Sequence, residues 1–345
     1  MNKELLRKII STPSPVGMED GVIKLIVQNA KNVADDFIYD NFGSVTTVYN
    51  KDSDFKIGLM AHSDEISLIV NGYNHDGSLT VTNNGGIKAR LYVGCKVRIV
   101  CNDKVFKGVM GVNNSLTSKD KVSADDLFVD FGCKSKEEAA KLVPLGSFII
   151  HDTDFDELQN DFITGRAFDD RLGVFITQEA SLKAKLEGAT SGIYCTASVG
   201  EENSGRGAYS SSQFVKPDVE IIVDVTFAND YKGADEPGTV NVGDGGVICI
   251  GTTINRKLKS MLEETAKELN LPIQYEVWPG RTGTDGDTVI KTNNGVPIVL
   301  FSIPLRYMHS PIEIASYKDV ESMIEILSKF IIKLNGSIDF KPYSF

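Results

Sequence analysis

The amino-acid sequence predicts an α/β fold, in which a mixed central sheet carries helices on both faces and a small β-rich domain is inserted. From residue 164 to the carboxyl end, apolar runs of strand length alternate with amphipathic helical stretches, a rhythm typical of α/β sheets. Between residues 71 and 163, short β-type runs are instead separated by Gly, Asn and Asp. We therefore expect a larger domain of residues 1–70 and 164–345, and an inserted β-rich domain of residues 71–163.

The amino-terminal part is expected to begin with two helices and continue into strands. Residues 3–11 and 18–33 are predicted to be helical, because apolar residues in the second stretch recur at the spacing of one helix face. The apolar run Phe55 to Ala61 is a predicted strand that ends at His62-Ser63-Asp64-Glu65. Ile66 to Val70 is expected to resume it.

The inserted region is expected to consist mostly of short strands, with one helical stretch at Ser135 to Leu142. The strands predicted there are Leu79 to Thr82, Lys96 to Val100, Val105 to Val112, Leu127 to Phe131 and Ser147 to Ile150.

The carboxyl-terminal part is expected to supply most of the sheet. Helices are predicted over residues 169–186, 207–214, 255–269 and 317–334. The strands predicted between them are residues 193–199, 220–225, 247–250, 273–277 and 296–303.

Composition and charge exclude several classes of partner. The chain has 345 residues, 41% hydrophobic and 24% charged, which is typical of an ordinary globular protein. Its formal net charge of −11 argues against nucleic acid and against an anionic membrane as partners. The first residues lack the apolar core of a signal peptide, and no apolar run approaches the length of a membrane span. We therefore expect a cytoplasmic protein.

The cysteines and histidines are few enough to be assessed one by one. The five cysteines are odd in number and show no C-x-x-C spacing, so we expect buried, reduced, structural thiols. Of the four histidines, His75 and His151 have polar, turn-like surroundings and are expected at the surface. His62 and His309 remain as candidates for a functional site.

The candidate site consists of polar residues that end apolar strands or begin the following helix. In an open α/β sheet, such strand ends meet along one edge. Two imidazoles and several carboxylates, with no thiolate, favour zinc, cobalt or manganese in a hydrolytic site. These donors exceed what one catalytic zinc needs, and they fit two cations that share a carboxylate. The set is His62, Asp64, Asp169, Glu201, Glu202, Asp224 and His309.

Taken alone, most of these residues have an ordinary structural explanation. The Glu201-Glu202 pair is compatible with an exposed surface pair, Asp169 with a helix cap, and His309 with a loop position. Asp224 is different because it interrupts an apolar strand, where a carboxylate without a partner is costly. We expect Asp224 to have a specific partner.

Asp64 follows His62 at the second position along an extended segment. Residues at this spacing point to the same side of a strand. Asp64 is therefore expected to orient the His62 imidazole.

The ordered set of motifs resembles one family, the dinuclear-metal aminopeptidases of the tetrahedral, dodecameric type (metallopeptidase family forty-two), some of which once carried an endoglucanase label. The resemblance covers nearly the whole chain. It rests on His62-Ser63-Asp64-Glu65-Ile66, Phe168-Asp169-Asp170-Arg171-Leu172-Gly173, Glu201-Glu202-Asn203-Ser204-Gly205-Arg206-Gly207-Ala208, Val223-Asp224-Val225-Thr226, Gly283-Thr284-Asp285 and Arg306-Tyr307-Met308-His309-Ser310.

The resemblance implies a role for each residue of the candidate site and a zinc-peptidase-like fold. Two divalent metal ions per subunit would be held, zinc first and cobalt or manganese as alternatives. The family removes amino-terminal residues from short peptides through a metal-bridged hydroxide. Matched to the motifs, the implied roles are His62 and Asp224 on one metal, Glu202 and His309 on the other, Asp169 as the bridge, Asp170 as its support, Glu201 as general base, and Asp64 steadying His62.

The resemblance also implies how the subunits assemble. The inserted domain matches the dimerisation module of the family, from which dimers build a homo-oligomeric dodecamer with an internal chamber. Such a chamber would limit substrates to short or unfolded peptides.

Two departures from the family pattern concern the substrate more than the chemistry. Ser67 stands where a Gly is common, and Gly286-Asp287 stands where Ala-Gly is frequent. Neither change removes an expected ligand, but the second alters a loop that we expect near the substrate pocket. Arg281 in that loop would favour acidic substrates, and a solvated loop arginine is the alternative.

Other functions remain open at this point. A deacylase or carboxypeptidase could use the same dinuclear chemistry on other amides. A non-catalytic scaffold of the same fold is a further alternative, although no expected ligand is missing. A glycoside hydrolase would need two carboxylates acting on a sugar without a metal.

Overall fold

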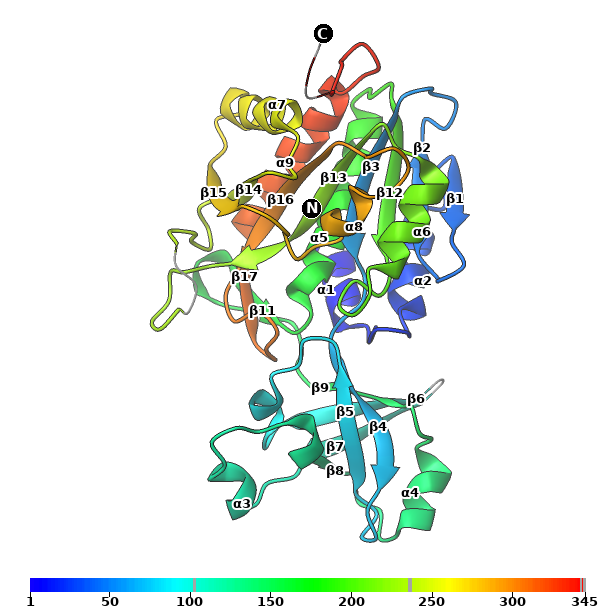
Figure 1. The fold of residues 1–345 in the computed structure, drawn as a ribbon, viewed down its shortest axis with the longest axis vertical. Coiled ribbons are helices and arrows are strands. Elements are labelled where there is room, and N and C mark those ends of the chain that lie inside the picture. Colours follow the sequence, from blue (N-terminus) through cyan, green and yellow to red (C-terminus); the bar gives the residue numbers. More distant parts are fainter. Residues whose placement is uncertain (102–103, 235–237, 342, 344–345) are drawn as a thin grey trace.

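The computed structural model describes residues 1–101, 104–234, 238–341 and 343, and it contains two bodies of different architecture (Figure 1). An α/β body surrounds an eight-stranded sheet, and a six-stranded closed barrel hangs below it. Two stretches of chain join them, one leaving the sheet after residue 62 and one returning after residue 151.

The large sheet is mixed, as the sequence predicts. Its strand order is β1-β2-β12-β3-β13-β16-β14-β15. The four central strands run parallel to one another, whereas β1, β2 and β14 pair antiparallel with their neighbours β2, β12 and β16. The strands are β1 (Asp36–Tyr39), β2 (Val45–Tyr49), β3 (Lys56–His62), β12 (Gly192–Ser198), β13 (Val219–Phe227), β14 (Gly246–Gly251), β15 (Ile273–Trp278) and β16 (Ile298–Leu305).

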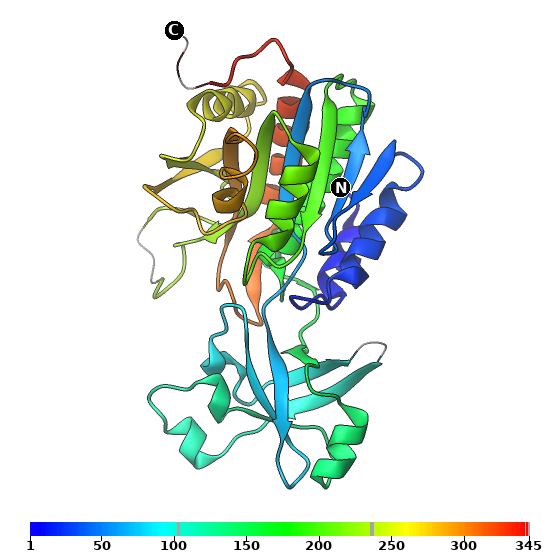
Figure 2. The ribbon, with the colours of Figure 1, turned by 45° about the vertical axis from the view of Figure 1, so that its right-hand side comes forward.

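Helices cover both faces of this sheet, which confirms the predicted fold class (Figures 1 and 2). The central strands are consequently buried on both sides, and this explains their nearly continuous apolar sequences. α5 (Phe168–Leu186) and α9 (Tyr317–Lys333) cover one face, together with α1 (Lys3–Ser11), α2 (Asp20–Ala30) and, against α9, α7 (Arg256–Glu268). α6 (Arg206–Val215) and the short α8 (Gly286–Val289) cover the other.

The barrel has the strand order β4-β5-β8-β7-β6-β9 and a hydrophobic core of its own, which includes Leu68, Val97 and Ile149. Besides α4, which lies on the predicted helix, it carries the short helix α3 and two 3₁₀ turns. The elements are β4 (Ser67–Tyr73), β5 (Leu79–Asn84), η1 (Ala89–Tyr92), β6 (Lys96–Cys101), β7 (Lys104–Met110), α3 (Asn114–Thr117), η2 (Ala124–Asp126), β8 (Phe128–Asp130), α4 (Lys136–Leu142) and β9 (Phe148–His151).

The barrel runs from β4 to β9, residues 67–151, so both of its ends lie earlier in the chain than the limits 71 and 163 expected from composition. β4 does not continue β3, because it pairs with β5 and β9, so the barrel begins at Ser67 rather than at residue 71. After β9 the chain enters a small sheet of order β10-β11-β17, with η3 (Gln159–Asp161) between its first two strands. The strands β10 (Asp156–Glu157), β11 (Phe162–Gly165) and β17 (Glu313–Ser316) lie beside the α/β body, so the chain has returned before residue 163.

Two further expectations concern the state of the cysteines and the presence of a membrane-spanning helix. The five cysteines form no disulfide; Cys101, Cys195 and Cys249 are buried as expected, whereas Cys95 and Cys133 are only partly buried. Among the described residues, no helix combines the length and apolar character needed to cross a membrane.

Candidate active site

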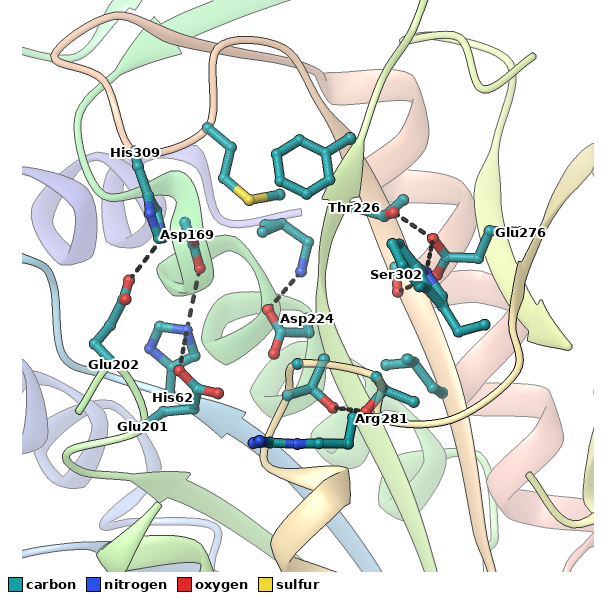
Figure 3. Close-up of a pocket in the computed structure, with 18 residues that line it drawn as sticks. His62, Asp169, Glu201, Glu202, Asp224, Thr226, Glu276, Arg281, Ser302 and His309 are labelled. Carbon is teal, nitrogen blue, oxygen red and sulfur yellow. Dashed lines mark hydrogen bonds and ion pairs between the residues drawn. The ribbon is translucent and has the colours of Figure 1, made fainter. Parts of the chain in front are cut away.

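The polar residues expected at the strand ends converge on one cavity at the edge of the large sheet (Figure 3). The parallel strands β3, β12, β13 and β16 bring their carboxyl ends to this edge. α5 begins at the same place, and the loop between β16 and β17 folds over it. The converging residues are His62, Asp169, Glu201, Glu202, Asp224 and His309.

The Asp169 carboxylate lies between the two imidazoles. Its Oδ1 is 3.1 Å from His62 Nε2, and its Oδ2 is 3.1 Å from His309 Nε2. Glu202 Oε1 approaches the same nitrogen, His309 Nε2, to 3.3 Å. Glu201 Oε2 lies 4.0 Å from His62 Nε2, so its carboxylate faces the same space.

Asp224 is 6% exposed, and its Oδ1 accepts the backbone N–H of Val225 at 2.7 Å. Within the described residues, no side chain donates to this carboxylate. The specific partner expected from its place in an apolar strand is therefore not another side chain of the described chain.

Burial shapes the electrostatics of the whole cluster. Desolvation raises the pKa of the Glu201 carboxyl to about 10, and nearby Asp224 adds to this effect. Desolvation likewise raises the pKa of Glu202 and Asp224. No Lys or Arg of the described chain forms an ion pair with these carboxylates, because the nearby cations are paired elsewhere, as Arg206 is with Glu19. Cations in the site would be needed to hold all these groups ionised.

The donor set fits divalent cations. Ligand atoms of His62, Asp169 and Glu202 lie within 4.8 Å of one another, and so do those of His62, Asp170 and Asp224. Mixed imidazole and carboxylate donors suit zinc, cobalt or manganese.

Asp170 is fully buried, and backbone amides occupy both of its carboxylate oxygens. Oδ2 accepts from the His62 N–H at 3.3 Å, and Oδ1 accepts from the Gly173 N–H at 3.1 Å. A Cβ on Gly173 would lie 2.3 Å from Asp170 Oδ1, so the carboxylate fills the space beside that glycine. This arrangement fixes the end of β3 against the start of α5.

Asp64 contacts the backbone of the glutamate pair as well as His62. Its Oδ1 is 3.7 Å from His62 Nδ1, which exceeds hydrogen-bond length. The same carboxylate accepts the backbone N–H groups of Glu201 and Glu202, each at 3.1 Å. Asp64 therefore holds the loop that presents both glutamates.

Glu313, on β17, is a supporting residue that the sequence analysis missed. Its Oε2 accepts the Phe168 N–H at 2.7 Å, and its Oε1 accepts the His309 N–H at 2.9 Å. It thereby links the start of α5 to the loop that carries His309. A signal was present in the sequence, because Glu313 is a lone acid among the apolar residues Ile312, Ile314 and Ala315.

The inserted barrel also contributes to the wall of the site. Gly85 and Gly86 directly follow β5. A Cβ on Gly86 would lie 2.9 Å from the His309 imidazole, and one on Gly85 would lie 3.5 Å from the Cβ of Glu202. The backbone of this segment therefore approaches the site more closely than a larger residue would allow.

The expectation that His151 is a surface residue is wrong. His151 ends β9, is only 8% exposed, and stacks on Tyr92 with ring centroids 3.8 Å apart. Desolvation, together with the positive charge of Arg166, lowers its pKa to about 4. Its polar neighbours in the sequence suggested a turn. In the structure the ring is covered by Tyr92 of η1, which lies far from His151 in the sequence. His75 is exposed, as expected.

The cavity has a volume of about 490 Å³, within the usual range for small-molecule sites. Arg281 lines it, but its side chain is 86% exposed and pairs with Asp287, with Nε 3.3 Å from Oδ2.

Comparison with known proteins decides the family. The sequence model described as M42 glutamyl aminopeptidase matches residues 43–326. This chain belongs to the M42 aminopeptidase family. It is thus a hydrolase of the aminopeptidase class, and the resemblance seen in its motifs is confirmed.

Individual relatives of this M42 aminopeptidase extend the match over nearly its whole length. It is 34% identical to the lysyl aminopeptidase of Pyrococcus furiosus, over 98% of this chain and 99% of the relative. Its structure superposes on the TET aminopeptidase of a marine sediment Thaumarchaeota archaeon with a TM-score of 0.91 and 28% identity, over 97% of each chain. The PhTET1-12s dodecamer gives a TM-score of 0.85 at 26% identity, over 97% of this chain and 100% of that one.

Proposed function

We propose that this M42 aminopeptidase removes amino-terminal residues from short peptides with two divalent cations in the cavity described above. The observation that carries the proposal is the position of the Asp169 carboxylate between His62 and His309, in a cluster of acids that no Lys or Arg of the described residues pairs with. His62 and Asp224 would hold one cation, Glu202 and His309 the other, and Asp169 would be shared. Zinc suits these donors first, and cobalt or manganese are alternatives.

The cations would lower the pKa of water and stabilise the negative charge that develops on a carbonyl oxygen. Glu201 would act as the general base. Its carboxylate faces the space beside His62 and Asp169, so it can take a proton from the attacking water. The same carboxyl group would then return the proton to the leaving amine nitrogen.

Asp64 and Glu313 would position these groups rather than react. Asp64 keeps Glu201 and Glu202 on adjacent sides of the cavity through their backbone amides. Glu313 does the same for His309 and the start of α5. Geometry held by buried hydrogen bonds is what efficient proton transfer requires.

We also propose that the barrel (residues 67–151) is a dimerisation module and that dimers assemble into a dodecamer. Large apolar side chains are exposed on the barrel, which supports a contact with another subunit. They are Leu91, Val105, Val109, Val112, Leu142 and Leu145.

The proposed activity is tested with matched peptides that differ only at their ends. We expect hydrolysis of peptides with a free amino terminus, loss of hydrolysis when that terminus is acetylated, and little effect of amidating the carboxyl terminus. Chelation should abolish turnover, and zinc, cobalt or manganese should restore it. Preferential cleavage of the acetylated peptide would indicate a deacylase, and dependence on a free carboxyl terminus would indicate a carboxypeptidase.

A further inference from the structure

The cavity has a second polar region, across from the histidines, formed around Glu276. This residue lies on β15, where Tyr275 and Val277 point outward and are exposed, so Glu276 and Trp278 face the other side. Figure 3 shows the Glu276 carboxylate on the opposite side of the cavity from His62, beside Thr226 and Ser302.

Three side chains donate hydrogen bonds to the Glu276 carboxylate. Oε2 accepts from the Thr226 hydroxyl and, at 3.0 Å, from the Trp278 indole N–H. Oε1 accepts from the Ser302 hydroxyl at 3.3 Å. Such donors favour the ionised carboxylate and fix its orientation.

Glu276 has no cationic partner in the part of the chain that the structure describes. Desolvation raises the pKa of its carboxyl above the ordinary value. A cation bound in the cavity could therefore form an ion pair with a partly buried Glu276 carboxylate. Arg281 does not fill this role, because it is directed to Asp287 at the exposed rim.

The geometry of the sheet places Glu276 where the side chain of a substrate residue can reach it while the backbone of that residue lies at the proposed metal centre. Asp224 and Thr226 lie two residues apart on one face of β13, which is about 7 Å along a strand. Ser302 on β16 is the direct neighbour of Asp224 in the parallel register. Glu276 accepts hydrogen bonds from both Thr226 and Ser302, so its carboxylate lies beyond Asp224, on the far side of the cavity from His62 (Figure 3).

Apart from the two polar regions, the lining of the cavity includes the apolar residues Phe227, Trp278, Leu300 and Met308. A cavity with apolar lining and a carboxylate on its far side matches a long aliphatic stem with a charged tip, as in lysine and arginine.

We propose that Glu276 binds the cationic side chain of a lysine or arginine at the amino terminus of the substrate and makes the enzyme selective for basic residues. This proposal rests on the proposed function. It assigns the specificity of the same cavity to a residue outside the proposed metal centre.

The test compares kcat/KM on the p-nitroanilides of lysine, arginine, leucine and glutamate. We expect the unmodified enzyme to prefer lysine and arginine. In Glu276→Gln, kcat/KM for these two should fall on the order of 100-fold, whereas the value for leucine should change by less than about threefold. Glu264→Gln, an equal charge change at an exposed position on α7, is the matched control and should leave all four values unaltered.

The outcomes separate this proposal from the one on which it rests. Preference of the unmodified enzyme for leucine or glutamate would overturn the role of Glu276 while leaving the aminopeptidase activity intact. An equal loss on all substrates in Glu276→Gln would indicate a structural role and would also overturn it. If none of the four amides were hydrolysed with any of the three metals present, the proposed function itself would fail.

Discussion

At the scale of single residues, the adjacent acids Glu201 and Glu202 show how two identical side chains acquire different environments. Asp64 holds both backbone amides, so the two side chains leave a fixed loop in different directions. The Glu202 side chain is 6% exposed and contacts His309, whereas the Glu201 side chain is 16% exposed and faces the open cavity beside His62. The two substitutions below should therefore have different effects.

Glu201→Gln should keep both cations and lose catalysis. The amide preserves the shape of the side chain but cannot take a proton, and general acid–base catalysis contributes roughly 10²- to 10⁴-fold. Metal analysis and kcat measured on the same sample check this prediction. Turnover close to that of the unmodified enzyme would remove Glu201 from the mechanism.

Glu202→Gln should instead lower the metal content below two ions per chain, because a neutral amide is a weaker ligand than a carboxylate. Elemental analysis after dialysis measures this directly. Full occupancy in this variant would show that the ligand assignment is wrong.

At the scale of elements, the barrel and the α/β body meet at the site. The segment after β5 lies against His309 and Glu202, and Tyr92 and His151 of the barrel line a small cavity together with these two residues. The inserted barrel is therefore coupled physically to the cavity, and changes in its joining segments should affect both metal binding and stability.

Gly86→Ala should displace the His309 imidazole, because the new methyl group would lie 2.9 Å from the ring. Disturbing a ligand in this way typically costs about 10- to 100-fold in metal affinity. Competition with a coloured chelator measures the affinity. Gly280→Ala is the control, since a Cβ there meets nothing within 4 Å. Equal affinities in the two variants would contradict the contact.

His151 should make the protein less stable in mild acid. Burial lowers its pKa from 6.5 to about 4. Above pH 6.5 the ring is neutral in both the folded and the unfolded state, so it does not change the stability. Between pH 6.5 and 4 only the unfolded state binds a proton, so the folded state loses stability. Near pH 5 this amounts to about 2 kcal/mol of unfolding free energy. Urea unfolding at pH 7 and pH 5 should show a smaller loss in His151→Gln than in the exposed control His75→Gln. Identical losses would argue against a buried neutral His151.

At the scale of the whole molecule, the proposed assembly gives a direct prediction. Light scattering after size exclusion should give a mass twelve times that of the 37.7 kDa chain, as in the PhTET1-12s dodecamer. The exposed apolar side chains of the barrel would supply the driving force, since a contact with another subunit removes apolar surface from water. A stable monomer with metal present would count against the dodecamer.

Much of this protein could be predicted from the local sequence. The alternation of apolar runs with amphipathic stretches predicted the mixed α/β sheet, because the spacing of apolar residues reports directly on which faces are buried. The position of polar residues at the ends of those runs predicted that His62, Asp169, the glutamate pair and His309 would meet, since parallel strands share one edge. Their convergence on one cavity bears this out.

Only the tertiary structure decided the contacts made across long distances in the chain. Glu313 supports the site because β17 pairs with β11, and Glu276 enters the cavity because β15 lies at the edge of a sheet whose order differs from the order of the sequence. His151 is buried because η1 covers it. Local sequence records which face of an element is apolar, whereas the neighbour of a polar side chain depends on strand order and packing, which are set by the whole chain at once.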